Sequence, residues 1–97
     1  IYGSRDGGQS WELANGFPLA QLYQIHADDR EPFYHLTMGL QDNGNWTGPS
    51  RTRDPLGILG DDWRIVSYGD GYYSVTHPED PDLFLTDQQG GWIYRTD

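Results

Sequence analysis

The stretch "SRDGGQSW", residues 4–11, sets a glycine pair among short polar side chains and ends on a tryptophan. Glycine reaches positive φ without a steric penalty, so the pair predicts a tight turn. Ser4 and Asp6 carry short side chains that can bond backbone N–H groups within such a turn. Trp11 follows at once, and we expect it to anchor the turn against another part of the fold.

The composition points to a small β protein with a thin aromatic core. Of the 97 residues 35% are hydrophobic, but four Trp, seven Tyr and three Phe supply large contact areas. Fifteen acids against six arginines and no lysine give a net charge of −9, which disfavours nucleic acid and anionic membranes as partners. Twelve of these acids are the turn former Asp, so acidic turns are the preferred interpretation, and a salt-adapted or Ca²⁺-exposed protein is the alternative.

Other functional classes are excluded by what the sequence lacks. There is no cysteine, and therefore no disulfide, thiol nucleophile or Cys–zinc site. No apolar run approaches the roughly 20 residues of a membrane span, so we expect no membrane insertion. The chain opens on Ile1 rather than Met, inside an expected strand, and we expect it to be a mature fragment or an excised piece of a longer protein.

Alternating apolar and polar residues predict short strands separated by turns, with helix minor or absent. The fold class is therefore all-β. The segment 41–62 between two of these strands reads as one long loop. The expected strands are 22–27, 33–40, 63–68, 72–76, 83–86 and 92–96.

The chain also repeats. "YQIHADDREPFY" (23–34) lies over "YSVTHPEDPDLF" (73–84), which places Tyr23 on Tyr73, and "IYGS" at the start resembles "IYRT" near the end. The period is about 46 to 52 residues with about four strands in each, which matches the four-stranded blade of a β-propeller.

This repeat predicts about two blades, cut between the third and fourth strands. Residues 1–13 would end one blade with the turn described above, 14–68 would form the second, and 69–97 would supply most of a third. Two blades cannot close a ring. The partners expected are therefore the remaining blades of a parent protein or other copies of this chain.

"SRDGGQSW" resembles the Asp-box, Ser-x-Asp-x-Gly-x-Thr/Ser-Trp, also called the BNR repeat, of sialidases, sortilin-type propellers and xyloglucanase-like glycoside hydrolases. The resemblance implies that Ser4 and Asp6 bond the turn backbone, that Gly7 and Gly8 permit the turn, and that Trp11 packs between blades. It also implies a structural role on the side away from the ligand.

The rest of the chain resembles a narrower group. "LQDNGNWTGPS" (40–50) and "GDGYY" (69–73) are similar to segments of large secreted bacterial proteins described as VPS10-like or BNR-repeat glycosyl hydrolases. The resemblance implies an extracellular or periplasmic location and is specific for fold rather than activity. One departure is "DDW" (61–63), which keeps the tryptophan of an Asp-box without its turn.

The long loop holds most candidate ligand-binding residues, because loops of that length are often functional. An aromatic ring beside amides and carboxylates suits a sugar or a peptide, and paired arginines suit a carboxylate. The alternative is structural: a turn at 42–44, a tryptophan packed on a neighbouring blade, and arginines that neutralise local acids. The candidates are Asp42, Asn43, Trp46, Arg51 and Arg53.

The turn "YGDGYY" (68–73) adds Asp70 and Tyr72 to this set. In a propeller it links the outer strand of one blade to the inner strand of the next, so Asp70 would face the central channel or, alternatively, cap the turn backbone. Asp42 and Asp70 are also weak catalytic candidates, since a glycosidase pair needs carboxyls roughly 5–10 Å apart.

The sequence predicts no cofactor. His26, His35 and His77 lack the spacing of a metal site and are expected as strand and turn residues. The acidic segment "HPEDPD" (77–82) suggests Ca²⁺ as a candidate metal, but it lacks the order of ligand residues found in a calcium loop.

The preferred functional hypothesis is a structural propeller segment that presents loops to a glycan or a peptide. A fragment of a glycoside hydrolase, sialidase- or xyloglucanase-like, is the enzymatic alternative, with Asp42 or Asp70 as acid or base. A third possibility is a fragment that assembles with copies of itself.

Overall fold

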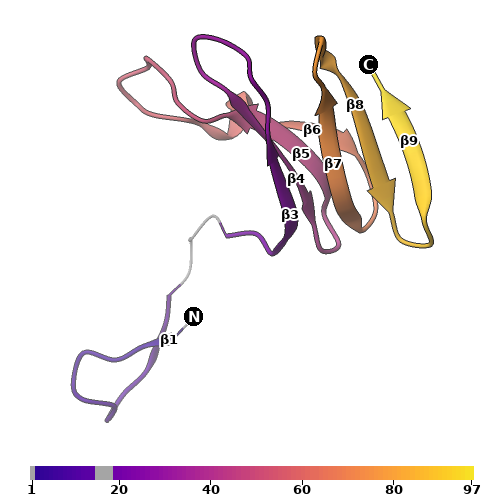
Figure 1. The fold of residues 1–97 in the computed structure, drawn as a ribbon. Coiled ribbons are helices and arrows are strands. Elements are labelled where there is room, and N and C mark those ends of the chain that lie inside the picture. The colour runs from indigo at the N-terminus through magenta and orange to yellow at the C-terminus, as the bar shows by residue number, and fades with distance from the viewer. Residues whose placement is uncertain (1, 15–18) are drawn as a thin grey trace.

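The computed structural model describes residues 2–14 and 19–97, and it is all-β (Figure 1). Strands account for 51% of the described residues. The described residues contain no α-helix and no helical stretch long and apolar enough to cross a bilayer. The elements are β1 (Tyr2–Gly3), β2 (Glu12–Leu13), β3 (Leu22–Ala27), β4 (His35–Leu40), β5 (Gly44–Pro49), the 3₁₀ helix η1 (Gly60–Asp62), β6 (Arg64–Ser67), β7 (Gly71–His77), β8 (Asp80–Gln88) and β9 (Trp92–Thr96).

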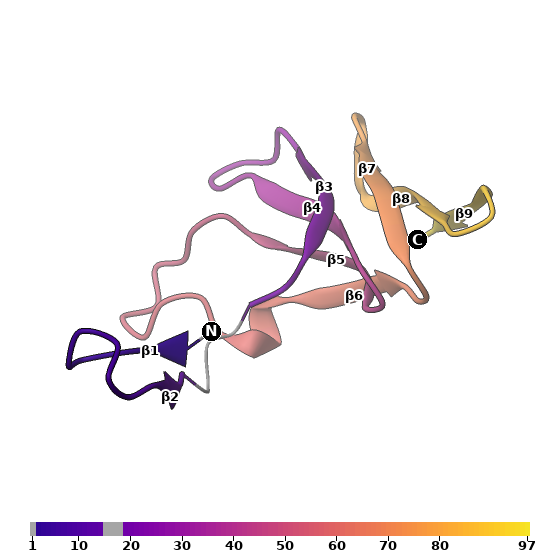
Figure 2. The same cartoon turned by 90° about the horizontal axis from the view of Figure 1, so that it is seen from below.

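The strands form three antiparallel sheets rather than the two blades expected. They are the hairpin β1-β2, the four-stranded sheet β3-β4-β5-β6 and the three-stranded sheet β7-β8-β9. Each sheet falls within one of the segments 1–13, 14–68 and 69–97. The two larger sheets stack with β7 against β3, β4 and β5, while the hairpin lies apart from them (Figures 1 and 2).

All six expected strands are present. The prediction of one long loop over residues 41–62 is wrong for the first part of that range. Residues 44–49 form β5, which pairs with β4 through Met38 and Trp46 and with β6 through Trp46 and Ile65. Glycine and proline are poor strand formers, so the local sequence did not indicate it. Pairing on both sides satisfies its backbone groups, and the loop that remains is 50–63.

The two larger sheets share one register at their second hairpin. Leu40 pairs with Gly44 across a three-residue turn, and Gln88 pairs with Trp92 across another. The β4–β5 and β8–β9 hairpins are therefore equivalent, and Leu40 corresponds to Gln88.

The first hairpins of the two sheets share an irregularity. Leu22 pairs with Leu40 and Gly71 pairs with Gln88, so Leu22 corresponds to Gly71; in both strands the register then shifts. Tyr23 follows Leu22 as Tyr72 follows Gly71. The register thus superposes Tyr23 on Tyr72, one residue away from the Tyr73 of the sequence overlay, because Leu22 lies 49 residues before Gly71 whereas the overlay used an offset of 50.

The contact between the two larger sheets is mostly polar. The Oγ1 atoms of Thr37 and Thr76, one from each sheet, lie 3.3 Å apart, and the Asn45 amide donates to the Asp87 carbonyl across the interface. The buried apolar side chains among the described residues are few: Leu40, Val66 and Phe84. Small hydroxyl side chains fill the remaining interior: Thr37, Thr47, Ser67, Ser74, Thr76 and Thr86.

Two glycines, Gly39 and Gly71, let the sheets approach. A Cβ on Gly39 would lie 2.3 Å from the Tyr72 carbonyl oxygen and 2.4 Å from that of Gly71. A Cβ on Gly71 would lie 2.4 Å from the Gly44 carbonyl oxygen. Backbone meets backbone here, and no side chain fits between.

The turn of the hairpin β1-β2 is held by the side chains of Ser4 and Asp6. The Ser4 hydroxyl accepts the Gly8 N–H at 2.7 Å, and one Asp6 carboxylate oxygen accepts the N–H groups of Gln9 and Ser10 at 3.0 and 2.9 Å. Gly7 and Gly8 take the positive φ values 73° and 92° that the turn needs.

Trp11 does not pack between the sheets of this chain. Its side chain is 63% exposed, and its ring lies close to Gly8. Trp63 stands in the corresponding place before β6 and is half-buried, with its ring against Gly48. The four-stranded sheet supplies strands beside Trp63, whereas the hairpin offers Trp11 only its own turn.

Replacing Gly39 by alanine is expected to destabilise the fold by about 1–3 kcal/mol, because the new methyl meets the backbone of β7. The measurement is the free energy of unfolding in urea. Gly60→Ala is the matched control, since nothing lies within 4 Å of its Cβ position, and its effect should stay within about 0.5 kcal/mol. Equal effects of the two variants would contradict the close approach.

The turn held by Ser4 and Asp6 should titrate at unusually low pH. Hydrogen bonds from Ser10 and Ser4 lower the pKa of Asp6 from 3.8 to about 2. The turn is therefore stabilised above pH 3.8, and the stabilisation is lost as the pH falls through about 2. The amide NMR shifts of Gln9 and Ser10 should titrate with that low midpoint and lose the transition in Asp6→Asn but not in Asp29→Asn. A midpoint near 3.8 would show that the bonds are absent in solution.

Candidate functional site

Three turns meet at one end of the stacked sheets, which we call the turn end. They are the β4–β5 turn (41–43), the β6–β7 connection (68–70) and the β8–β9 turn (89–91). The Gly44 N–H donates to the Gly69 carbonyl at 2.7 Å, and the Asp70 N–H donates to the Gln89 side-chain oxygen at 2.8 Å. Segments far apart in sequence thus form one surface.

The turn end brings Asp42 and Asp70 together. Asp42 is exposed and has a positive φ of 57°, and its N–H donates to the Asp70 carboxylate. Asp70 therefore caps the backbone of the neighbouring turn, which is the structural alternative that the sequence left open. A carboxylate used in this way fixes the relative position of the two sheets.

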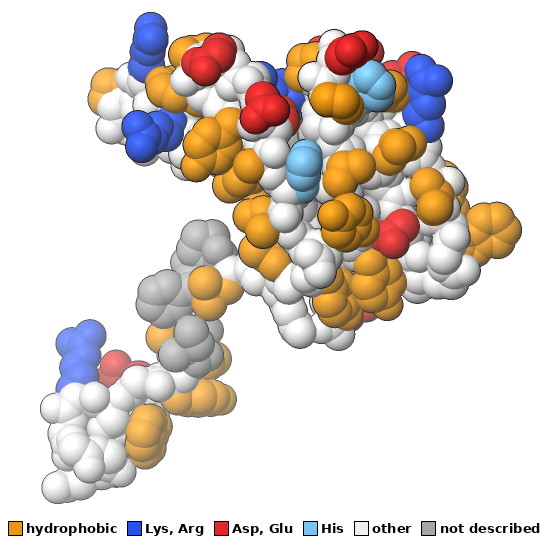
Figure 3. Space-filling model, viewed as in Figure 1, with side chains coloured by type: hydrophobic (Ala, Val, Ile, Leu, Met, Phe, Trp, Pro, Cys, Tyr) orange, Lys and Arg blue, Asp and Glu red, His pale blue; other side chains and the backbone are white. Residues whose placement is uncertain are grey.

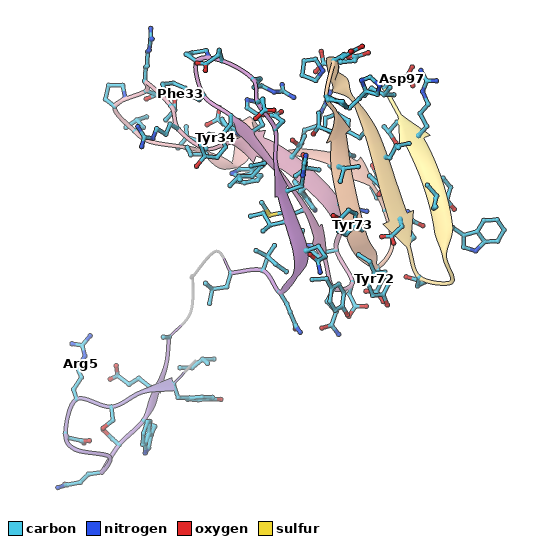
Figure 4. The ribbon with its side chains drawn as sticks, viewed as in Figure 1. Arg5, Phe33, Tyr34, Tyr72, Tyr73 and Asp97 are labelled. Carbon is cyan, nitrogen blue, oxygen red and sulfur yellow. The ribbon has the colours of Figure 1, made fainter. Side chains whose placement is uncertain are left out.

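Tyr23 and Tyr72 stack beside these acids, with ring centroids 4.8 Å apart and planes inclined by 20°. Figure 4 shows Tyr72 and Tyr73 at this end of β7. Partial burial and the negative charges of Asp70, Tyr72 and Asp42 raise the pKa of Tyr23. Because Tyr23 and Tyr72 occupy equivalent bulges, the stack joins the same position of two repeats.

Asn43 and Trp46 complete the turn end. The indole N–H of Trp46 donates to the Asn43 carbonyl at 2.6 Å, which ties the turn to β5. The Trp46 side chain is half-buried on β5, while the Asn43 side chain is exposed. The turn thus offers the amide of Asn43 to solvent next to the acids.

Arg51 and Arg53 do not join this group. Both lie in the loop 50–63, at the opposite end of β5 from the turn 41–43. Arg53 stands over the Phe33 ring at 5.9 Å, and Figure 4 shows Phe33 at that end. Neither arginine forms an ion pair within the described residues, so the expected neutralisation of local acids is absent there.

The opposite end also contains a cavity of about 330 Å³ between the β3–β4 and β7–β8 turns, lined in part by His26 and His77. Arg30 also lines this cavity, and its guanidinium donates hydrogen bonds to the Asp28 carboxylate at 2.6 Å and to the Pro81 carbonyl. Acidic side chains gather at this end in Figure 3. Within residues 2–14 and 19–97 no three His, Asp or Glu side chains come together as metal ligands.

The ionisable groups near this cavity form hydrogen bonds within the β3–β4 turn. Burial alone would raise the pKa of Asp28, but hydrogen bonds from the His35 N–H and from Arg30 outweigh it and lower the pKa. Burial and the charge of Arg30 lower the pKa of His35. His35 is therefore favoured as a neutral strand residue.

The turn end offers aromatic faces, an exposed amide and carboxylates, which suits recognition of hydroxyl or amide groups. Sequence reasoning missed Tyr23 and Gln89. The overlay that placed Tyr23 in the repeat was a signal for the first, whereas nothing distinguished Gln89 from any turn glutamine.

Comparison with known proteins found no matching family model, no matching curated protein and no matching solved structure.

The raised pKa of Tyr23 gives a test of the turn end. Asp70→Asn removes a nearby negative charge, so the pKa of Tyr23 should fall, while remaining above the ordinary value of 10.0 because the burial persists. ¹³C NMR of labelled tyrosine follows the titration, and Asp54→Asn in the far loop is the control. An unchanged pKa in Asp70→Asn would place the Asp70 carboxylate away from Tyr23.

Proposed function

We propose that the chain is a segment of an Asp-box β-propeller from a secreted bacterial protein, and that its turn end binds a glycan or a peptide. The segment holds about two blades' worth of strands: the end of one blade, a complete second and most of a third. The remaining blades come from a parent protein or from other copies.

The shared register of the two larger sheets is the main observation that supports the propeller proposal. Equivalent hairpins, equivalent bulges and stacked equivalent tyrosines are what repeated blades around an axis require. The hairpin supports it independently, because Ser4 and Asp6 make the backbone bonds of an Asp-box turn.

The polarity of the two ends supports a ligand at the turn end. The loop 50–63, which joins the third strand of the four-stranded sheet to the fourth, leaves that sheet at the other end. The turn end combines Tyr23 and Tyr72 with the exposed side chains of Asp42 and Asn43. Acids without arginines disfavour an anionic ligand, so the class is a neutral glycan or a peptide without net negative charge.

Binding is favoured over hydrolysis by the state of Asp70. A glycosidase pair needs two carboxyls free to act on one bond. Here the Asp70 carboxylate accepts the Asp42 N–H and is used in holding the turns. The arginine cluster of a sialidase is also not supported, since Arg51 and Arg53 lie at the other end.

The test is NMR titration of the labelled chain with cellohexaose and with an uncharged Gly/Ser/Tyr peptide. Shifts should concentrate at residues 41–43 and 68–72, and Tyr72→Ala should weaken the affinity roughly tenfold or more, equivalent to about 1.4 kcal/mol. Tyr34→Ala, at the opposite end, is the matched control (Figure 4).

The anionic trisaccharide sialyllactose serves as the negative probe. It should not shift the turn end, because the carboxylates there repel it. Shifts spread over the whole chain, or an unaltered affinity in Tyr72→Ala, would overturn ligand binding at this end.

A further inference from the structure

The two larger sheets pack against each other through one face each. Neither sheet covers the opposite face of the other. On the four-stranded sheet Ile25 pairs with Met38, and Met38 pairs with Trp46, so the three share a face. Thr37, which contacts the other sheet, points the opposite way. We call Ile25, Leu36, Met38 and Trp46 the first open face.

The three-stranded sheet has a second open face. Val75 pairs with Leu85, and Asp87 pairs with Ile93. Ile93 is 74% exposed and Leu85 is 48% exposed. The Asp87 carboxylate accepts the Tyr73 N–H, so the one acid of this group is tied into its own sheet. Arg95 pairs with Leu85 and therefore lies on the same face. The second open face is Val75, Leu85, Ile93 and Arg95.

The shared register relates these faces to the interface that already exists. Since Leu40 corresponds to Gln88, Met38 corresponds to Thr86 and Thr37 corresponds to Leu85. Thr86 is buried against the four-stranded sheet, and Met38 is its counterpart on the first open face.

Each open face is therefore the counterpart of one half of the contact between the sheets. Thr37 lies in that contact, and Leu85 is its counterpart on the second open face. The sheets pack head to tail, so each sheet uses only one of its two faces. The first and second open faces are the two faces that remain without a partner sheet.

We infer that a second copy of this chain binds here, its first open face against the second open face of its neighbour. Head-to-tail contacts of this kind form a ring where the rotation between neighbours closes. The open faces are more apolar than the contact within the chain, so self-association gains hydrophobic burial, which acts against the repulsion between copies of charge −9. The inference rests on the repeat that also supports the propeller, but on no ligand.

The test is the mass of the particle by light scattering after size exclusion at about 0.1 mM chain. A discrete multiple of 11.1 kDa is expected. Ile25→Lys blocks the first open face and Ile93→Lys the second, and each should weaken association at least tenfold and give monomer. Both positions are more than half exposed, at 54% and 74%, so the fold tolerates the change; Leu85→Lys repeats the test on the second face.

Mixing the two monomeric variants gives the sharpest result. One intact first face then meets one intact second face, so a 1:1 dimer and nothing larger should form. Leu56→Lys adds the same charge at a loop side chain that is 77% exposed and should keep the wild-type mass.

Three results would overturn the inference. The first is a monomeric wild type, as when the chain's own hairpin covers the first open face. The second is a variant that still associates alone, as in face-to-face pairing of identical surfaces, and the third is a mixture of the two variants that stays monomeric. None of these masses involves the glycan or peptide, so failure here leaves ligand binding at the turn end standing, and the converse holds too.

Discussion

The fold depends on one backbone contact, where the β4–β5 hairpin meets the start of β7. Gly39 and Gly71 lie against each other's strands without side chains between them, and the Gly44 N–H bonds the Gly69 carbonyl. This contact sets the separation of the two larger sheets at the turn end. The tyrosine stack and the Asp70 cap follow from it, because both join groups on different sheets.

Close approach also explains why so polar a chain can stack two sheets. Once the backbones are this near, only small side chains fit between them, and Thr37, Ser74 and Thr76 fill the space that larger apolar residues would need. The Thr37 hydroxyl donates to the Thr47 hydroxyl within its own sheet and contacts the Thr76 hydroxyl across the interface. Hydrophobic area that a thicker core would bury is left on the outer faces, at Met38 and Ile93 among others, so the thin interior and the apolar surface have the same cause.

The sequence predicted six of the strands and a turn bonded by Ser4 and Asp6, since both rest on local patterns. It missed β5, because Gly44 to Pro49 is strand only through pairing on both sides. It grouped Arg51 with Asp42, because one loop was expected where a strand separates them by the height of the sheet. The meeting of Asp42 with Asp70 depends on how two sheets stack, and no local pattern encodes that.

The acidic composition has a structural origin. In a fold made of short strands, each turn leaves backbone N–H groups without a strand partner, and an aspartate carboxylate can accept them where it stands. Seven of the twelve aspartates do so in this chain. They are Asp6, Asp28, Asp54, Asp62, Asp70, Asp80 and Asp87. The net charge of −9 therefore follows from the number of turns, and it needs neither a cationic partner nor adaptation to salt to account for it.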